Sequence, residues 1–323
     1  MEKVEFISPK ISIELNQIYE ISEINKQSKF VVKKTGKPLK KTQIQRLTGL
    51  GIPRVYETIW LSKSDSSDIQ AIALDKKNRK QYYYSKKWCQ ERETKKSEKV
   101  KNLFGVVKEI RKKTDNDKKR KGNVKIKTMA YMLRILELCS IRIGNTKYLD
   151  KYNSYGLTTL KKEHITFEKT SCVLNFNGKH NVKQKIVLKD KPVIRFLKNM
   201  FDLPEDWLMK YTNDTKVYYR VSAQDLNNYL HSIVLKLNHD TDFSCKDYRT
   251  YGANFVFLEK LQERGVPVSS KELAKNISDA IEDVSNTLGN NKAVSKSSYV
   301  MNEIIQCYKD NPAALLKHGM EIL

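Results

Sequence analysis

Residues 246–254 read Lys-Asp-Tyr-Arg-Thr-Tyr-Gly-Ala-Asn, and they place two cationic side chains, Lys246 and Arg249, at the predicted start of a helix. Arg249 taken by itself has a plain structural explanation, because it could pair with Asp247 or Glu259. Its importance therefore depends on whether other residues of suitable chemistry stand at the boundaries of predicted elements elsewhere in the chain.

Two further cations stand at such boundaries. Arg142 is predicted to end an apolar helix over residues 129–143. Lys179 directly follows the Asn177-Gly178 turn of a predicted β-hairpin. Each has a structural alternative, since Arg142 could be a cation at a helix C-terminus and Lys179 an ordinary turn lysine.

Two more polar residues flank a predicted loop over residues 291–298. Asn290 precedes this loop and Tyr299 follows it. Tyr299 could equally be a core residue of an amphipathic helix. Taken one at a time, each of these residues is therefore better explained by an ordinary structural role than by a catalytic one.

The remaining patterns predict an α+β chain of two domains, a β-rich domain over residues 1–95 and a mainly α-helical domain over residues 96–323. The predicted strands of the first domain are 30–32, 54–56, 69–74 and 82–84, separated in part by turn signals at 65–68 and 76–78. A helix is expected from Ser97, its candidate N-cap, and the basic run 111–121 is expected to be a solvated loop.

The second domain is predicted to hold one embedded β-hairpin among its helices. Strands are expected at 165–167, 173–176 and 182–188. Helix starts are predicted at Asp190, at the capping box Ser222–Asp225 and at the better-matched box Ser269–Glu272. Gly289 is expected to end the last of these helices, and a final helix is predicted from Val294 through Cys307.

The charge balance favours a polyanionic partner. Lys and Arg number 61 against 37 Asp and Glu, which gives a formal net charge of +24. Cations that neutralise phosphates release counterions, so nucleic acid is the expected partner, with a lysine-rich solubilising surface as the alternative. No membrane-spanning run or secretory leader is apparent. The five scattered cysteines contain no CxxC pair and favour a reducing interior.

Several cofactor motifs are missing from the sequence. It contains no GxxxxGK[ST], no GxGxxG and no HExxH. Asp115-Asn-Asp117 and Asp240-Thr-Asp242 have the spacing of metal ligands, but each lacks a third acid nearby. We therefore expect no cofactor and no bound metal.

Several blocks together resemble one family. Residues 246–254 resemble the K-D-x-R-T-Y-G-x-N segment of type IB DNA topoisomerases, most closely the small poxvirus-type enzymes. The other resembling blocks, all in the family's order, are 141–149 around the first catalytic arginine, 156–160, the lysine hairpin 176–182, the tyrosine motif 288–299, and the basic-aromatic strand 79–84. The resemblance spans roughly residues 50 to 305.

The resemblance implies an enzyme that relaxes supercoiled duplex DNA without ATP, through a 3′-phosphotyrosyl intermediate. Tyr299 carries over as the nucleophile, Arg142 and Arg249 as clamps on the phosphate oxygens, and Lys179 as the general acid. Asn290 stands where the poxvirus enzymes have a histidine, and its amide can donate to the same oxygen.

The resemblance also implies DNA contacts outside the reaction site. The residues that carry over are Arg79, Gln81, Tyr82, Tyr84, Lys147, Tyr148 and Lys246. Two lobes that bind opposite faces of the duplex imply a monomer closing as a C-shaped clamp. The expected location is intracellular and, for a viral protein, the virion and cytoplasmic replication sites.

Two alternatives remain beside this interpretation. A tyrosine recombinase or integrase shares the arginines, lysine and tyrosine, but it typically has a histidine where this chain has Lys246. A DNA-binding module without activity would also explain the charge, and it predicts that Tyr299 can be replaced by Phe. A monomer that relaxes plasmid without synapsis separates the topoisomerase from the recombinase.

Overall fold

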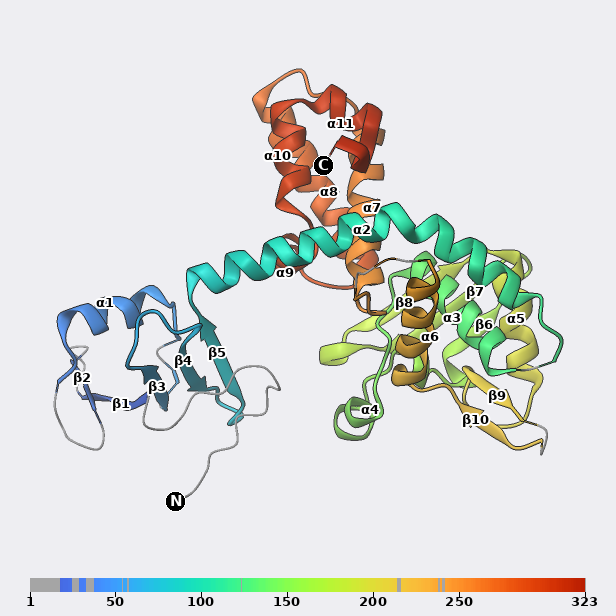
Figure 1. The fold of residues 1–323 in the computed structure, drawn as a ribbon, viewed down its shortest axis with the longest axis horizontal. Coiled ribbons are helices and arrows are strands. Elements are labelled where there is room, and N and C mark those ends of the chain that lie inside the picture. The colour runs from blue at the N-terminus through green and yellow to red at the C-terminus, as the bar shows by residue number, and fades with distance from the viewer. Residues whose placement is uncertain are drawn as a thin grey trace. The chain divides into compact units, whose positions relative to one another are not determined.

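The computed structural model describes residues 18–24, 29–32, 38–53, 55–56, 58–122, 124–213, 216–237, 239 and 242–322. The chain divides into two compact units, residues 1–96 and 97–323, and each is described by itself (Figure 1). Over the described part of the chain, no helix has both the length and the apolar character needed to cross a membrane.

The first unit is built on one antiparallel sheet with the strand order β2-β1-β3-β4-β5. Its strands are β1 (Ile18–Ile24), β2 (Lys29–Val32), β3 (Ile59–Ser62), β4 (Ile69–Leu74) and β5 (Lys80–Tyr84), and its helix is α1 (Lys41–Gly49). Apolar side chains of α1, β3 and β4 form its core, among them Leu47, Leu61 and Ala73. The strands predicted at 30–32, 69–74 and 82–84 are confirmed.

The strand predicted at 54–56 is wrong. Val55 lies in a turn, and the backbone N–H of Tyr56 donates to the Pro53 carbonyl at 3.1 Å. Arg54 falls outside the described residues. A proline donates no backbone hydrogen bond to a ladder, so the chain turns here and the strand forms after it, at β3.

Helix α2 (Lys86–Lys118) begins earlier and ends later than the sequence predicts. Its first turn is capped by Ser85, whose Oγ accepts from the Trp88 N–H at 3.1 Å. Ser97, the predicted cap, is buried within the helix. Most of the basic run 111–121, predicted as a loop, is also helical, and it is anchored by Asp117, which accepts from the buried Tyr229 hydroxyl at 2.8 Å.

The second unit is mainly helical and carries two small sheets. Its α-helices beyond the boundary-crossing α2 are α3 (Lys125–Cys139), α4 (Thr146–Tyr152), α5 (Lys191–Asp202), α6 (Ala223–Lys236), α7 (Asp247–Arg264), α8 (Ser270–Leu288), α9 (Lys292–Ser298), α10 (Asn302–Asp310) and α11 (Pro312–His318). Its strands are β6 (Ile165–Phe167), β7 (Cys172–Asn177), β8 (Lys183–Leu188), β9 (Lys210–Thr212) and β10 (Tyr218–Arg220).

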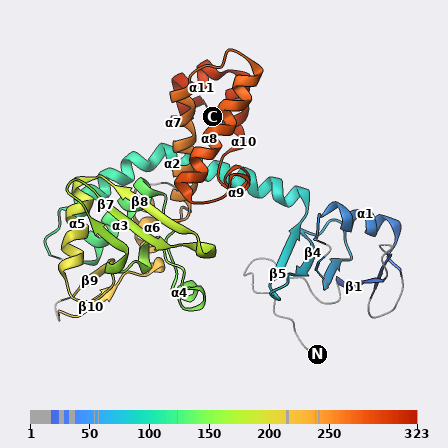
Figure 2. The same cartoon turned by 180° about the vertical axis from the view of Figure 1, so that it is seen from behind.

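Two apolar cores organise this unit. One core joins α3, α5 and α6 to the β6-β7-β8 sheet, and the other joins α7, α8, α10 and α11. Both cartoon views show α10 and α11 gathered about α7 and α8 (Figures 1 and 2).

The strands predicted at 165–167, 173–176 and 182–188 are confirmed as β6, β7 and β8, which form one three-stranded sheet. A further hairpin, which the sequence pattern does not predict, forms from β9 and β10. The predicted N-caps Asp190, Ser222 and Ser269 are confirmed, as is Gly289 at the end of α8. The ranking of the two capping boxes is wrong, because only Ser222 makes both reciprocal bonds. The Glu272 carboxylate accepts from the Val268 N–H instead of from Ser269.

Candidate active site

Arg142 lies on an extended segment and does not end a helix. Helix α3 stops at Cys139, because Ser140 adopts a left-handed conformation with φ of 49°. The segment is then tied to residues 156–158 by two bonds of 2.8 Å, from the Leu157 N–H to the Arg142 carbonyl and from the Thr158 N–H to the Ile143 carbonyl. The backbone that carries Arg142 is therefore held on both sides of its side chain.

Two glycines permit this close approach. A methyl group on Gly156 would lie 2.6 Å from the Cα of Gly144 and from the Arg142 carbonyl oxygen. Gly144 itself has φ of 88°, a conformation that side chains with a Cβ rarely adopt. Both positions therefore require glycine.

Arg249 is almost fully buried in the first turn of α7, at 4% exposure. Its Nη1 donates to the Ser140 carbonyl at 2.6 Å and its Nη2 to the Leu288 carbonyl at 2.5 Å. The guanidinium group thus ties the ends of α3 and α8 to α7. Burial and the nearby charge of Arg142 together lower the pKa of Arg249 to about 10.

Helix α7 reaches the end of α3 only because residue 252 has no side chain. A methyl group on Gly252 would lie 1.8 Å from the Ser140 Oγ. Because Gly252 has no side chain, α7 packs close enough to α3 for Arg249 to reach the Ser140 carbonyl.

Asn290 presents a buried donor to this site. The Arg142 Nη2 donates to its Oδ1 at 3.1 Å, which assigns Nδ2 as the opposite, donating end of the amide. That Nδ2 atom is buried and has no hydrogen-bond partner among the described residues. An unpaired buried donor is costly unless it serves a ligand.

Tyr299 lies at a break between two helices. The single helix predicted over 294–307 is wrong, because α9 ends at Ser298 and α10 begins at Asn302. One buried side chain spans the break: the Asn254 Nδ2 donates to the Tyr299 carbonyl and its Oδ1 accepts from the Met301 N–H, each at 2.9 Å.

No role is assigned to Asn254 from the sequence, although this asparagine is the last residue of the segment 246–254. Its signal is an asparagine in the interior of an apolar helix, where it forms a buried amide that needs partners. Here those partners are the backbone groups on either side of the break. Asn254 therefore fixes the backbone of Tyr299.

The Tyr299 ring is half-buried next to cations. The Arg249 guanidinium carbon lies 5.4 Å from its centroid. Burial raises the pKa of Tyr299, but the charges of Arg249, Arg142 and Lys246 outweigh burial, so the pKa lies below that of an ordinary phenol. A lower pKa favours the phenolate, the nucleophilic form.

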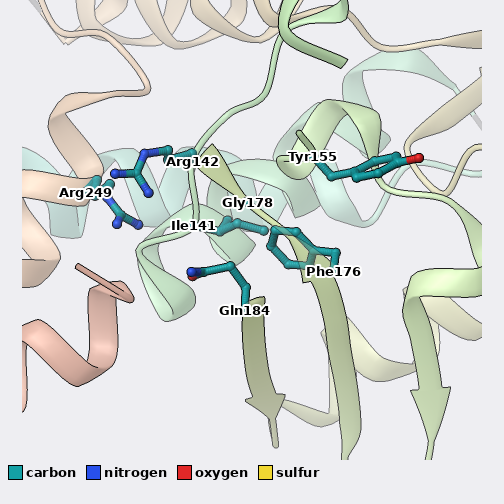
Figure 3. A pocket seen from close by; sticks show the side chains of 7 residues that line it. All are labelled: Ile141, Arg142, Tyr155, Phe176, Gly178, Gln184 and Arg249. Carbon is teal, nitrogen blue, oxygen red and sulfur yellow. The ribbon is translucent and has the colours of Figure 1, made fainter. Parts of the chain in front are cut away.

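A pocket opens beside the two arginines. It is lined by Ile141, Arg142, Tyr155, Phe176, Gly178, Gln184 and Arg249. Figure 3 shows both guanidinium groups at the same end of this pocket. Two adjacent cations beside the unpaired donor of Asn290 form a site suited to a phosphate group.

Lys179 lies next to this pocket, at the tip of the β7–β8 hairpin. The tip is not the predicted two-residue turn, because residues 179–181 form a short 3₁₀ turn and the Gly178 N–H donates to the Val182 carbonyl at 2.8 Å. The Lys179 side chain is exposed. The structure therefore brings together Arg142, Arg249, Asn290 and Tyr299, and it places Lys179 on the adjoining turn without a bond to them.

In the first unit, the residues predicted to contact DNA lie on two faces of the sheet, because successive side chains of β5 point to opposite sides. Arg79 and Gln81 both bind Asp75, at 2.7 Å through the arginine Nε and at 3.0 Å through the glutamine Nε2. Tyr82 and Tyr84 point to the opposite face from Gln81 and stack at 6.5 Å between centroids. Within the described part of the chain, Arg79 and Gln81 bind a carboxylate and the two tyrosines do not.

The tyrosine stack continues into α2. Tyr84 stacks on Trp88 with 3.9 Å between centroids, and the Arg92 guanidinium lies 5.2 Å from the Trp88 ring. Lys147 and Tyr148, in the second unit, are both exposed on α4, and Lys246 is exposed just before α7. Each of these residues is accessible to a ligand.

No cluster of three or more potential metal ligands occurs in the described parts of the chain. Of the acidic pairs, Asp115 binds Lys118 at 2.5 Å and Asp117 binds Arg120 at 3.1 Å. Asp240 lies outside the described residues. These carboxylates are used in pairing with neighbouring cations.

Comparison with known proteins identifies the family of this chain. The family model of the eukaryotic DNA topoisomerase I catalytic core matches residues 85–321. A DNA topoisomerase 1B of Acanthamoeba polyphaga mimivirus is 31% identical over 85% of this chain and 82% of its own length. A DNA topoisomerase I of monkeypox virus is 26% identical over 79% of this chain and 77% of its own length.

Among solved structures, a XerH site-specific recombinase bound to difH substrate covers 64% of this chain and 52% of its own, with 14% identity and a TM-score of 0.40. This superposition is too loose to carry an argument about the present chain.

The α+β fold and the family match define a DNA-cleaving enzyme of the tyrosine type. The chain belongs to the type IB DNA topoisomerases. Within that family it is similar to the small viral enzymes, and as a topoisomerase it relaxes supercoiled DNA by a tyrosine mechanism. Family membership favours this activity over the recombinase alternative.

Proposed function

We propose that Tyr299 attacks the scissile phosphate and that Arg142, Lys179, Arg249 and Asn290 assist it. The observation that carries this assignment is the Arg249 guanidinium, 5.4 Å from the Tyr299 ring and beside Arg142. A phosphate bound by both arginines would lie within reach of the phenol oxygen.

The reaction exchanges one phosphodiester for another. The Tyr299 hydroxyl gives its proton to water as its oxygen forms a bond to phosphorus. The bond from phosphorus to the 5′ oxygen breaks, and that oxygen leaves with a proton from Lys179, which takes one back from water. The covalent product is a 3′-phosphotyrosyl ester and a free 5′ hydroxyl. Resealing reverses each step, so the two ester bonds balance and no ATP is consumed.

Each assisting residue has a distinct part in this scheme. Arg142 and Arg249 donate to the non-bridging oxygens, whose negative charge grows in the transition state. The unpaired Nδ2 of Asn290 supplies a neutral donor to one of the same oxygens. Lys246 binds phosphate beside the site, where its charge already acts on Tyr299.

We also propose that two domains, residues 1–95 and 96–323, close on DNA as a monomeric clamp. The contacts assigned to the first domain are Arg79, Gln81, Tyr82 and Tyr84, and those to the second are Lys147 and Tyr148. The exposure of α4 and the stack along β5 support them. The viral sources of the relatives support action in an infected cell, at cytoplasmic replication sites and in the virion.

Trapping the covalent intermediate tests the proposed function. In EDTA and without ATP, the enzyme should become linked to the 3′ end of a cleaved strand, because the short downstream fragment that carries the free 5′ hydroxyl diffuses away. Protease digestion and mass spectrometry should place the nucleotide on the peptide that contains Tyr299. A nucleotide on another residue, or an adduct that forms only with added magnesium, would contradict the assignment.

Tyr82→Ala should weaken duplex binding without slowing the bound enzyme. The ring is at the open end of the β5 stack, so its loss removes a DNA contact and leaves Tyr84 on Trp88. We expect an affinity loss of roughly tenfold, or about 1.4 kcal/mol, in fluorescence anisotropy. Single-turnover cleavage at saturating enzyme should be unchanged. Tyr219→Ala, at an exposed tyrosine of β10, is the matched control.

Substitutions of Asn290 test its donor role. Asn290→Ala should slow single-turnover cleavage by roughly 10²–10³-fold, as for removal of one oxyanion donor. Asn290→His should retain much of the activity through its ring N–H. Asn290→Asp should be slower than Ala, because a carboxylate repels the phosphate. Near wild-type rates for both Ala and Asp would assign the donor to another residue.

A further inference from the structure

Gln184 lies inside the reaction pocket, although none of the roles above uses it. It stands on β8 opposite Phe176 and lines the same pocket as Arg142 and Arg249 (Figure 3). The strand alternates, so Gln184 is partly buried while its neighbours Lys183 and Lys185 are exposed. Gln184 is therefore the first residue after the hairpin tip to face inward.

Two glycines pack against this one side chain. A methyl group on Gly178 would lie 3.0 Å from the Gln184 Cγ, and one on Gly289 would lie 2.2 Å from its Nε2. The aliphatic part of Gln184 thus rests on one glycine and its amide end on the other. The space that it occupies exists because neither position has a Cβ.

These glycines are the neighbours of two proposed assisting residues. Gly178 directly precedes Lys179 on the hairpin, and Gly289 directly precedes Asn290 at the end of α8. Gln184 therefore spans the distance between the turn that carries the lysine and the segment that leads to the nucleophile.

The hairpin tip needs such a support. Residues 179–183 are all exposed, and His180 and Asn181 have φ of 62° and 60°. A general acid must come within hydrogen-bond reach of the leaving oxygen, and a displacement of about 1 Å can cost on the order of 10²-fold in rate. The placement of Lys179 therefore depends on how the base of the tip is held.

We propose that Gln184 is a positioning residue that holds the lysine hairpin against the Asn290 segment by filling the space between Gly178 and Gly289. The proposal rests on the proposed role of Lys179 as the general acid. The side chain of Gln184 makes no hydrogen bond to the described residues, so its action is steric packing. It sets the reach of Lys179 and does not itself touch the phosphate.

The test is single-turnover cleavage of two duplexes that differ at one atom. The first has an ordinary scissile phosphate, and the second has sulfur in place of the bridging 5′ oxygen, so the leaving thiolate needs no proton. Gln184→Ala should slow cleavage of the first duplex by about 10- to 100-fold. Cleavage of the second should be near the wild-type rate. Val187→Ala, at an exposed position of the same strand, should leave both rates unchanged.

Two further variants separate packing from a direct contact. Gln184→Met keeps the length of the side chain without its amide and should retain most of the activity. The double variant Lys179→Ala/Gln184→Ala should be no slower than Lys179→Ala alone. Gln184 acts only by placing the proton donor Lys179, so its loss has no further effect once that donor is gone. If the Met variant is as slow as the Ala variant, the proposal is overturned, and the Gln184 amide would instead bind the phosphate directly.

The outcomes also separate this proposal from the proposed function. If sulfur rescues Lys179→Ala but not Gln184→Ala, the positioning role is wrong and the general acid stands. If sulfur rescues neither, the general acid and the inference built on it both fail. A melting temperature for each variant shows that a slow enzyme is still folded.

Discussion

Tyr299→Phe should abolish DNA relaxation and covalent adduct formation while leaving DNA binding nearly intact. The substitution removes the attacking oxygen and nothing else. The aromatic ring that Arg249 approaches at 5.4 Å remains, and the backbone bonds to Asn254 do not involve the side chain. The loss should be on the order of 10⁶-fold, as when the nucleophile of a hydrolase is removed.

Three measurements check this result on the same protein preparations. Plasmid relaxation followed on an agarose gel and adduct formation followed on a denaturing gel should both fall below detection. Duplex affinity measured by anisotropy should stay within about twofold, or 0.4 kcal/mol. Tyr219→Phe is the control, since it removes the hydroxyl of an exposed tyrosine remote in sequence from Tyr299. An adduct with the Phe variant would exclude Tyr299 as the nucleophile.

Helix ends that are marked by a capping side chain or a glycine were predictable from the sequence. Asp190 and Ser222 cap their helices because a side-chain oxygen next to a helix start can accept its unpaired N–H groups. Gly289 ends α8 because it tolerates a left-handed conformation. These effects act over three or four residues, so a short stretch of sequence contains all the information needed.

Helix α2 shows where such reasoning fails. Residues 86–96 have little apolar periodicity, so the pattern predicts a start at Ser97, where burial begins. The exposed first turns form nonetheless, with Ser85 as the cap and Lys87 and Glu91 paired at 3.8 Å. Helix propensity and local pairing extend a helix beyond its buried part, and a search for apolar residues does not detect them.

The residues of the site could be named from sequence, whereas their arrangement could not. The resemblance to known enzymes singled out Arg142 and Tyr299. The break that exposes Tyr299 depends on Asn254, 45 residues earlier in the chain, and the position of Arg142 depends on the contact between Gly144 and Gly156. Such long-range contacts leave no periodic signal, so only the folded chain reveals them.

Lys179→Ala should slow cleavage of ordinary DNA strongly, because the 5′ oxygen is a poor leaving group without a proton donor. Loss of a general acid typically costs about 10²–10⁴-fold. The side chain is exposed on the hairpin tip and has no ion pair in the described structure, so its removal should leave the fold unchanged. The defect should therefore appear in the rate of the chemical step.

The bridging-sulfur duplex distinguishes the loss of a proton donor from the loss of a phosphate contact. A thiolate leaves without a proton, so Lys179→Ala should cleave that duplex at close to the wild-type rate. Lys185→Ala, which removes an exposed lysine from the same hairpin, should leave the cleavage rate of both duplexes nearly unchanged at saturating enzyme. Equal defects of Lys179→Ala on oxygen and sulfur would mean that this lysine binds the phosphate, because a lost electrostatic contact slows both reactions alike.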